Sequence, residues 1–80
     1  MKIPRDLSGW SLIGKLKRYG YEPTRQTGSH IRLTTQCNGE HHITIPNHNS
    51  LKIGTLSSIL DLVAEHLDIS KMELVEQLFG

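Results

Sequence analysis

The stretch Arg25-Gln26-Thr27-Gly28-Ser29-His30-Ile31-Arg32-Leu33 decides how this chain folds. The glycine at its centre predicts a turn, because glycine adopts the backbone conformations that tight turns require. The alternation that follows predicts a strand, with Ile31 and Leu33 on one face and His30 and Arg32 on the other. The polar face therefore carries an imidazole, which can exchange a proton at physiological pH, beside a guanidinium that can bind a phosphate.

A second hairpin follows, marked by an Asn-Gly pair at residues 38–39. A three-residue loop over residues 37–39, with its glycine left-handed, places Leu33 opposite Ile43. A strict two-residue turn would instead place Leu33 opposite Thr44, an apolar side chain against a polar one. The three-residue loop is therefore favoured. It predicts an open face that carries His30, Arg32, Thr34, His42 and Thr44.

Helical patterns flank the strands on both sides. Ser8 is a good N-cap for a first helix that ends at Gly20, and Ser70 has capping-box spacing to Glu73 in a short helix running to about Leu78. A longer helix precedes that one. The apolar stripes are Trp10, Leu12, Ile13, Leu16 and Tyr19 in the first helix, Leu56, Ile59, Leu60, Val63 and Leu67 in the second, and Met72, Val75 and Leu78 or Phe79 in the third.

This order predicts an α+β fold in which helices cover the one apolar face of a three-stranded antiparallel sheet. Pro23 lies in the first strand, over residues 21–26, and indicates an edge position because proline cannot donate to a strand ladder. The 80 residues are 36% hydrophobic and 21% charged, which predicts a single domain over residues 1–80. The lone Cys37 excludes an internal disulfide. We find no signal peptide or membrane-spanning run, so a soluble, cytoplasmic protein is expected.

The charges are unevenly distributed along the chain. The net charge is only +1, which excludes a basic field over the whole molecule, so any nucleic-acid binding must use clustered cations. Lys15, Lys17 and Arg18 either complement the dipole of the first helix or form a patch that faces phosphates. Cations of the first half are Lys2, Arg5, Lys15, Lys17, Arg18, Arg25 and Arg32, and acids of the last third are Glu65, Asp68, Glu73 and Glu76.

Several segments together resemble the HicA toxin family, also known as YcfA-like proteins. The resemblance covers residues 1 to about 67, and its most specific piece is Gly28-Ser29-His30, followed at the right distance by Gly54-Thr55-Leu56. It implies a fold like the double-stranded-RNA-binding domain. It also implies a toxin that cleaves messenger RNA and is held inactive by a HicB-type antitoxin. Its other segments are Leu7-Ser8-Gly9, Leu16 to Glu22, Arg25-Gln26-Thr27, Ile43-Thr44-Ile45-Pro46 with His48, and Leu51-Lys52-Ile53.

The resemblance assigns the catalytic role to His30. Cleavage of RNA needs a base for the ribose 2′-hydroxyl, cations for the charge that builds on the phosphate, and an acid for the leaving oxygen. Lys52 is expected beside free amides at a helix start, where anions bind. A second acid or base is His42, His48 or neither. The expected RNA-binding residues are Arg25, Ser29, Arg32 and Lys52.

Two alternatives compete with this interpretation. A zinc site is disfavoured because His41 and His42 are adjacent on a strand and point to opposite faces, and no carboxylate is spaced to help. We therefore expect neither a metal nor another cofactor. The stronger alternative is a non-catalytic RNA-binding module of the same fold. Replacing His30 distinguishes the two functions, since a pure binder keeps its affinity without the imidazole.

Overall fold

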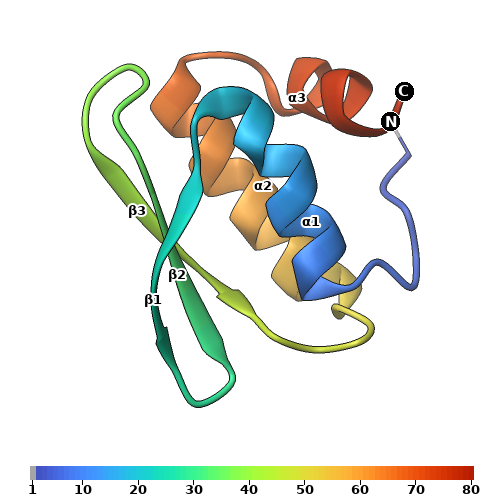
Figure 1. The fold of residues 1–80 in the computed structure, drawn as a ribbon. Coiled ribbons are helices and arrows are strands. Elements are labelled where there is room, and N and C mark those ends of the chain that lie inside the picture. The colour runs from blue at the N-terminus through green and yellow to red at the C-terminus, as the bar shows by residue number, and fades with distance from the viewer. Residues whose placement is uncertain (1) are drawn as a thin grey trace.

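The chain folds as a three-stranded antiparallel sheet with helices on one face, seen in a computed structural model that describes residues 2–80 (Figure 1). The strands lie in the order β1-β2-β3, and α1 and α2 both contact β3. This confirms the predicted α+β class. In chain order the elements are α1 (Gly9–Leu16), the 3-10 turn η1 (Lys17–Tyr19), β1 (Glu22–Thr27), β2 (His30–Thr35), β3 (His41–Pro46), α2 (Ile53–Leu67) and α3 (Lys71–Phe79).

The predicted caps lie at Ser8, Gly20 and Ser70, but the first helix is α-helical only to Leu16 and continues to Tyr19 as η1. The Ser8 hydroxyl accepts a hydrogen bond from the Ser11 amide at 3.0 Å, and the Ser70 hydroxyl accepts one from the Glu73 amide at 3.0 Å. Each bond satisfies an amide that the first helical turn leaves without a backbone partner. Gly20 ends η1 in the left-handed conformation, with φ of 82°. The short polar residues and the glycine therefore define these boundaries locally.

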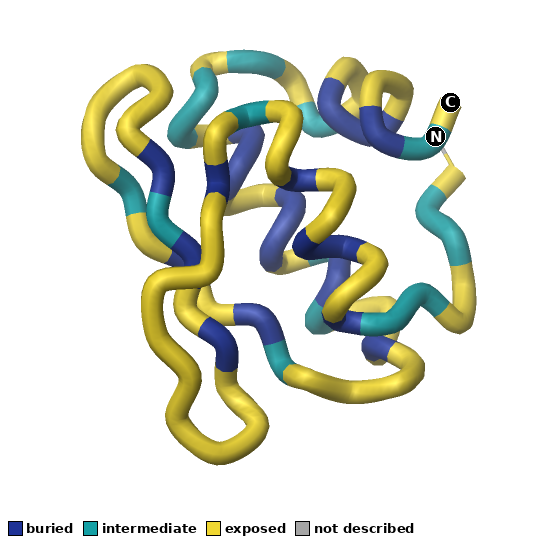
Figure 2. The backbone as a smooth tube through the Cα atoms, viewed as in Figure 1, coloured by how far each residue is buried: buried dark blue, intermediate teal, exposed yellow. Residues whose placement is uncertain are grey.

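The register of β2 and β3 matches the prediction. Leu33 pairs with Ile43 and Ile31 pairs with Ile45, and the last pair, Thr35 with His41, encloses the five residues 36–40, in which Gly39 has φ of 96°. All four apolar side chains are buried against the helices, while the opposite face stays open. β1 is an edge strand with a bulge after Pro23. All of its residues are exposed (Figure 2).

Two predicted core residues are exposed instead. Trp10 is 50% exposed and Met72 is 64% exposed. Leu74, absent from the predicted stripe, is buried in the third helix. Spacing in the sequence places Trp10 near an apolar stripe, but the buried face of the helix is centred on Leu12 and Leu16, roughly a third to nearly half of a turn away from Trp10.

The loop between β3 and α2 is held against the start of α1. A Cβ on Gly9 would lie 2.1 Å from the carbonyl oxygen of Pro46, so only glycine fits this close approach. The Gly9 amide donates to the His48 carbonyl at 2.9 Å, and the Leu51 amide donates to the Leu7 carbonyl at 2.8 Å. The end of β3 is thus packed directly on the first turn of α1.

Two of the three clustered cations of the first helix hold α3 in place. Lys15 Nζ donates to the Leu78 carbonyl at 3.4 Å, and the Arg18 guanidinium donates to the Gln77 carbonyl. Cations beside the carbonyl end of a helix interact favourably with its dipole. The structure therefore gives Lys15 and Arg18 a third role that neither sequence interpretation included. Within residues 2–80, no helix combines the length and the apolar character needed to span a lipid bilayer.

Candidate functional site

The β1–β2 hairpin tip provides a fixed base for His30. Thr27 pairs with His30 across a two-residue turn, in which Gly28 has φ of 57°. A glycine with positive φ at the first turn position is typical of tight hairpins. Gln26 Nε2 donates to the Gly28 carbonyl at 3.2 Å, and the Asn47 amide donates to the Ser29 carbonyl at 2.6 Å. The tip is therefore fastened both to itself and to the loop after β3.

The His30 side chain is exposed and free to meet a ligand. It starts β2, directly opposite Pro46 at the end of β3. Within residues 2–80, no hydrogen bond or ion pair engages its imidazole; the two ion pairs join other residues. Because no described protein group bonds to the ring, both ring nitrogens remain available for proton transfer. The backbone that carries the ring is held in place by the contacts of the hairpin tip.

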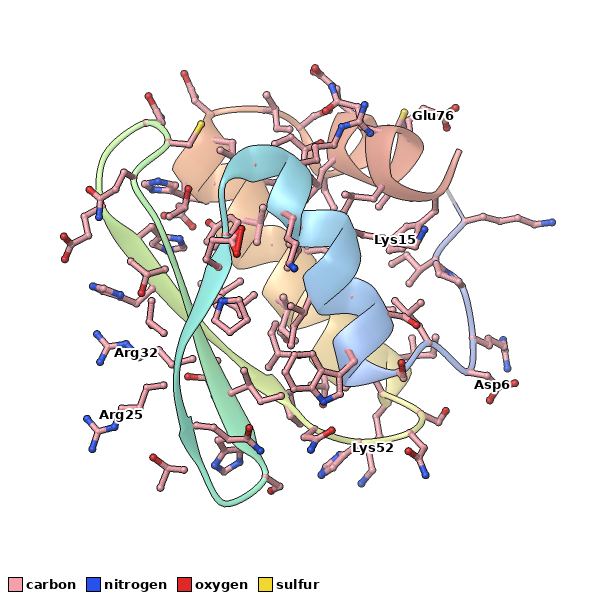
Figure 3. The ribbon with its side chains drawn as sticks, viewed as in Figure 1. Asp6, Lys15, Arg25, Arg32, Lys52 and Glu76 are labelled. Carbon is pink, nitrogen blue, oxygen red and sulfur yellow. The ribbon has the colours of Figure 1, made fainter. Side chains whose placement is uncertain are left out.

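Arg25 and Arg32 lie directly opposite one another on β1 and β2. Both guanidinium groups project to the same side, away from the helices (Figure 3). Neither takes part in an ion pair within the described residues. Like charges directly opposite in a sheet are unfavourable, so an anion bound between them would relieve their repulsion. Arg32 is two residues from His30 on the same face, which is about 7 Å along a strand.

The remaining two predicted RNA-binding residues lie in different places. Ser29 is in the exposed turn beside His30. Lys52 is the N-cap residue of α2 and makes no capping side-chain bond. Figure 3 shows Lys52 on the opposite side of the view from Arg25 and Arg32. The structure thus gathers Arg25, Ser29 and Arg32 around the start of β2 and places Lys52 apart from the arginines.

His42 is too far from His30 to act with it. It pairs with Thr34, four residues along β2 from His30, which is about 13 Å along a strand. Its Nδ1 shares a 2.8 Å hydrogen bond with the Thr34 hydroxyl, and its Nε2 lies 2.9 Å from Glu40 Oε2. Hydrogen bonds from Gln36 and then from His42 lower the pKa of the Glu40 carboxyl. His42 therefore belongs to a separate polar network across the open face.

His48 lies at the same end of the molecule as His30. Its carbonyl accepts from the Gly9 amide, and the preceding residue, Asn47, donates to Ser29 in the hairpin tip. The β3–α2 loop thus connects the start of α1 with the turn that presents His30. Of the two histidines considered as a second acid or base, His48 is the one placed near the tip.

The two other histidines form a pair at the far end of the sheet that sequence reasoning missed. The His41 ring stacks on His66 with centroids 4.2 Å apart, and His41 Nδ1 shares a 2.7 Å hydrogen bond with the Tyr21 hydroxyl. Burial lowers the pKa of His41, and the nearby His66 lowers it further. Burial likewise raises the pKa of Tyr21 to about 12. His66 carried no signal because it is a lone histidine on a helix, and only the tertiary fold brings it to β3.

The four histidines considered for a zinc site are dispersed over the fold. His41 packs toward the helices, and His42 lies on the open face. Among residues 2–80, no three histidine, cysteine, aspartate or glutamate side chains lie close enough together to share a metal ion. The side chains gathered near His30 are the cations Arg25 and Arg32 and the hydroxyl of Ser29.

Comparison with known proteins identifies the family. The family described as "HicA toxin of bacterial toxin-antitoxin" matches residues 11–64, which include all three strands and His30. Trp10 and α3 lie outside the matched residues. No curated protein and no solved structure matches the chain significantly. Since the match covers well over half of the 80 residues, the chain belongs to the HicA toxin family of bacterial toxin–antitoxin systems.

Proposed function

We propose that this toxin is an endoribonuclease that cleaves messenger RNA, with His30 as its catalytic residue. The observation that carries the proposal is the exposed, unengaged imidazole on a fastened hairpin tip, beside two arginines that lack an acidic partner within residues 2–80. A surface histidine without a function would require neither a backbone held in place nor two arginines beside it. Arg25, Ser29 and Arg32 bind the RNA next to His30, and Lys52 contacts the chain farther along.

The reaction follows from these groups. His30 takes the proton from a ribose 2′-hydroxyl, and the 2′-oxygen forms a bond to the adjacent phosphorus as the bond to the 5′-oxygen breaks. The products are a 2′,3′-cyclic phosphate and a 5′-hydroxyl. Arg25 and Arg32 stabilise the charge that builds on the phosphate oxygens. His48 is the second imidazole that protonates the leaving oxygen. This route uses side chains alone and requires no metal ion.

Membership of the family implies an antitoxin partner. We propose a HicB-type antitoxin with an acidic domain that covers the open face, neutralises the arginines and separates His30 from RNA. We further propose that both proteins act in the cytoplasm, where messenger RNA is translated. Because antitoxin and RNA would occupy the same surface, their binding should be mutually exclusive.

The experiment compares His30→Ala with His42→Ala in cleavage and binding of the same RNA. Loss of a general base costs roughly 10²–10⁴-fold in rate, so His30→Ala should lose cleavage and growth arrest yet still bind RNA. His42→Ala removes an imidazole from the same open face and should cleave normally. His48→Ala should be slower than wild type. Wild-type activity should persist in EDTA.

Other outcomes would change the assignment. Cleavage by His30→Ala at the wild-type rate would remove His30 from the mechanism. Wild-type protein that binds RNA without cutting it would instead support the non-catalytic RNA-binding module. Loss of activity in EDTA that zinc or magnesium restores would establish a metal-assisted reaction.

A further inference from the structure

Trp10 is a large aromatic side chain that the fold leaves half exposed. It is 50% exposed in the first turn of α1, and it is the only tryptophan of the chain. The core beneath α1 consists of Leu12, Ile13 and Leu16, all of which are almost completely buried. The exposed half of this side chain forgoes its burial energy, so a ligand that covers it would gain that energy on binding.

Trp10 lies at the same end of the molecule as His30. The preceding residue, Gly9, packs against the carbonyl of Pro46, and Pro46 pairs with His30 across the sheet. The Gly9 amide also bonds the carbonyl of His48. A chain of direct backbone contacts thus connects the start of α1 with the proposed catalytic residue.

Trp10 and Gly14 share a flank of α1, and Lys17, the helical C-cap of α1 and first residue of η1, continues that flank. At 100° per residue these three positions fall within about 60° of one another, and Trp10 and Lys17 are about 10 Å apart along the axis. A Cβ on Gly14 would meet nothing within 4 Å, so the helix surface between the aromatic ring and the cation is bare. Lys15 lies on the other flank, where its Nζ contacts α3.

The neighbouring strand leaves this flank uncovered. Pro23 and Gln26 of β1 pair with Leu33 and Ile31, which point toward the helices and are buried. Pro23 and Gln26 are nevertheless exposed, because the helices cover β2 and β3 but not β1 (Figure 2). A nucleic acid bound at the hairpin tip can therefore extend along this side of α1.

We propose that Trp10 stacks on an unpaired nucleobase of the RNA substrate while Lys17 binds its phosphate chain. This inference rests on the proposed function and names the substrate class as single-stranded RNA. An aromatic platform beside a cation is the combination that single-strand binders use, since every base has a face to stack. The open sheet face around Arg32 offers cations, hydroxyls and the imidazoles of His30 and His42, but among the described residues it carries no tryptophan, tyrosine or phenylalanine. A protein-docking surface would instead surround Trp10 with apolar neighbours, and its flank carries glycine and lysine.

The single tryptophan makes the test direct, because fluorescence excited at the long-wavelength edge, where the two tyrosines do not absorb, comes from Trp10. The probe is a single-stranded 2′-O-methyl RNA, which lacks the free 2′-hydroxyl required for cleavage. Its addition should quench the fluorescence saturably. The same oligonucleotide as a duplex, or with abasic sites, should bind through its phosphates and quench much less. Equal quenching by all three, or binding without quenching, would overturn the stacking.

Substitution provides the second arm. Trp10→Ala should weaken binding of the single strand about 5- to 100-fold, and Trp10→Phe should recover most of the loss. Leu62→Ala is the matched control, since Leu62 is 51% exposed and lines the surface beside His41 at the other end of the sheet. Circular dichroism checks that each variant is folded.

The outcomes separate this inference from the proposed function. If Trp10→Ala binds and cleaves RNA like wild type while His30→Ala does not cleave, the nuclease assignment stands and the stacking is wrong. If no variant and no wild-type protein cleaves RNA, the proposed function fails irrespective of Trp10. Fluorescence that responds to a HicB-type antitoxin but not to RNA would identify the Trp10 flank as a protein surface and overturn the inference.

Discussion

At the scale of single residues, Arg25 and Arg32 combine a cost to the fold with a benefit to binding. Their two positive charges face each other across the strands, and neither has an acidic partner within residues 2–80. Arg25→Thr should therefore raise the free energy of unfolding by a few tenths of a kcal/mol, because it removes a like-charge pair and keeps a good strand former. The same variant should bind RNA more weakly. Its log–log salt dependence should lose a slope of about 0.7 for one lost phosphate contact on a single strand.

Urea unfolding and RNA titrations at several salt concentrations measure the two effects. Arg5→Thr is the control, since it removes the same charge from the segment beside Phe79, away from the sheet. An unchanged affinity and salt slope in Arg25→Thr would show that RNA does not contact this arginine.

At the scale of elements, the stacked His41–His66 pair joins β3 to α2 and should make stability depend on pH. Burial, then the charges of His66 and His42, lower the pKa of His41, against a smaller opposing effect of Glu65. A histidine whose folded pKa is lowered binds its proton more readily in the unfolded chain. Its contribution is therefore complete above its ordinary pKa of 6.5 and is lost as the pH falls below that value.

Denaturant unfolding at pH 7.5, 6.5 and 5.5 tests this dependence. His41→Gln should show a smaller fall in the free energy of unfolding below pH 6.5 than wild type. His42→Gln alters an imidazole on the open face and should retain most of the fall. An identical pH dependence in wild type and His41→Gln would show that His41 titrates alike in both states.

The elements also show where sequence reasoning succeeds. The caps at Ser8 and Ser70, the left-handed Gly20 and the β2–β3 register depend on a few neighbouring residues, so local patterns predict them. The orientation of Trp10 depends on which flank of α1 the sheet covers, and no spacing in one segment specifies that. The same limit explains the unpredicted His41–His66 pair and the Arg18 contact with α3, which join residues far apart in sequence. The tip at His30 was predictable because its motif and turn are contiguous, and the predicted register already pairs His42 with Thr34, four residues along β2 from His30.

At the scale of the whole molecule, the small net charge conceals a local cationic surface. Association with an acidic antitoxin domain should be steered by the arginines of the open face. Exposed charges are screened beyond about 10 Å at 0.1 M ionic strength, so added salt should slow association more than it speeds dissociation. Arg32→Ala should reduce both the association rate and its salt dependence. Stopped-flow mixing with the cognate HicB-type protein measures these rates.

A complex that still cleaves RNA, or an association rate indifferent to both salt and Arg32, would place the antitoxin elsewhere. The acidic helical end around Glu65 to Glu76 is then the alternative surface.

The contact between Gly9 and Pro46 has a genetic consequence. A side chain at position 9 would displace the loop that carries His48 and fastens Ser29, so it would disturb the geometry around His30 without touching any reacting group. When the toxin is expressed without its antitoxin, only cells with inactivating mutations survive. Sequencing of such survivors should recover Gly9 substitutions repeatedly, beside changes at His30. Replacements of Gly54, where an added Cβ would meet nothing within 4 Å, should be rare. The close packing of one helix on one strand end would thus be visible as a mutational hot spot in a population of escaping bacteria.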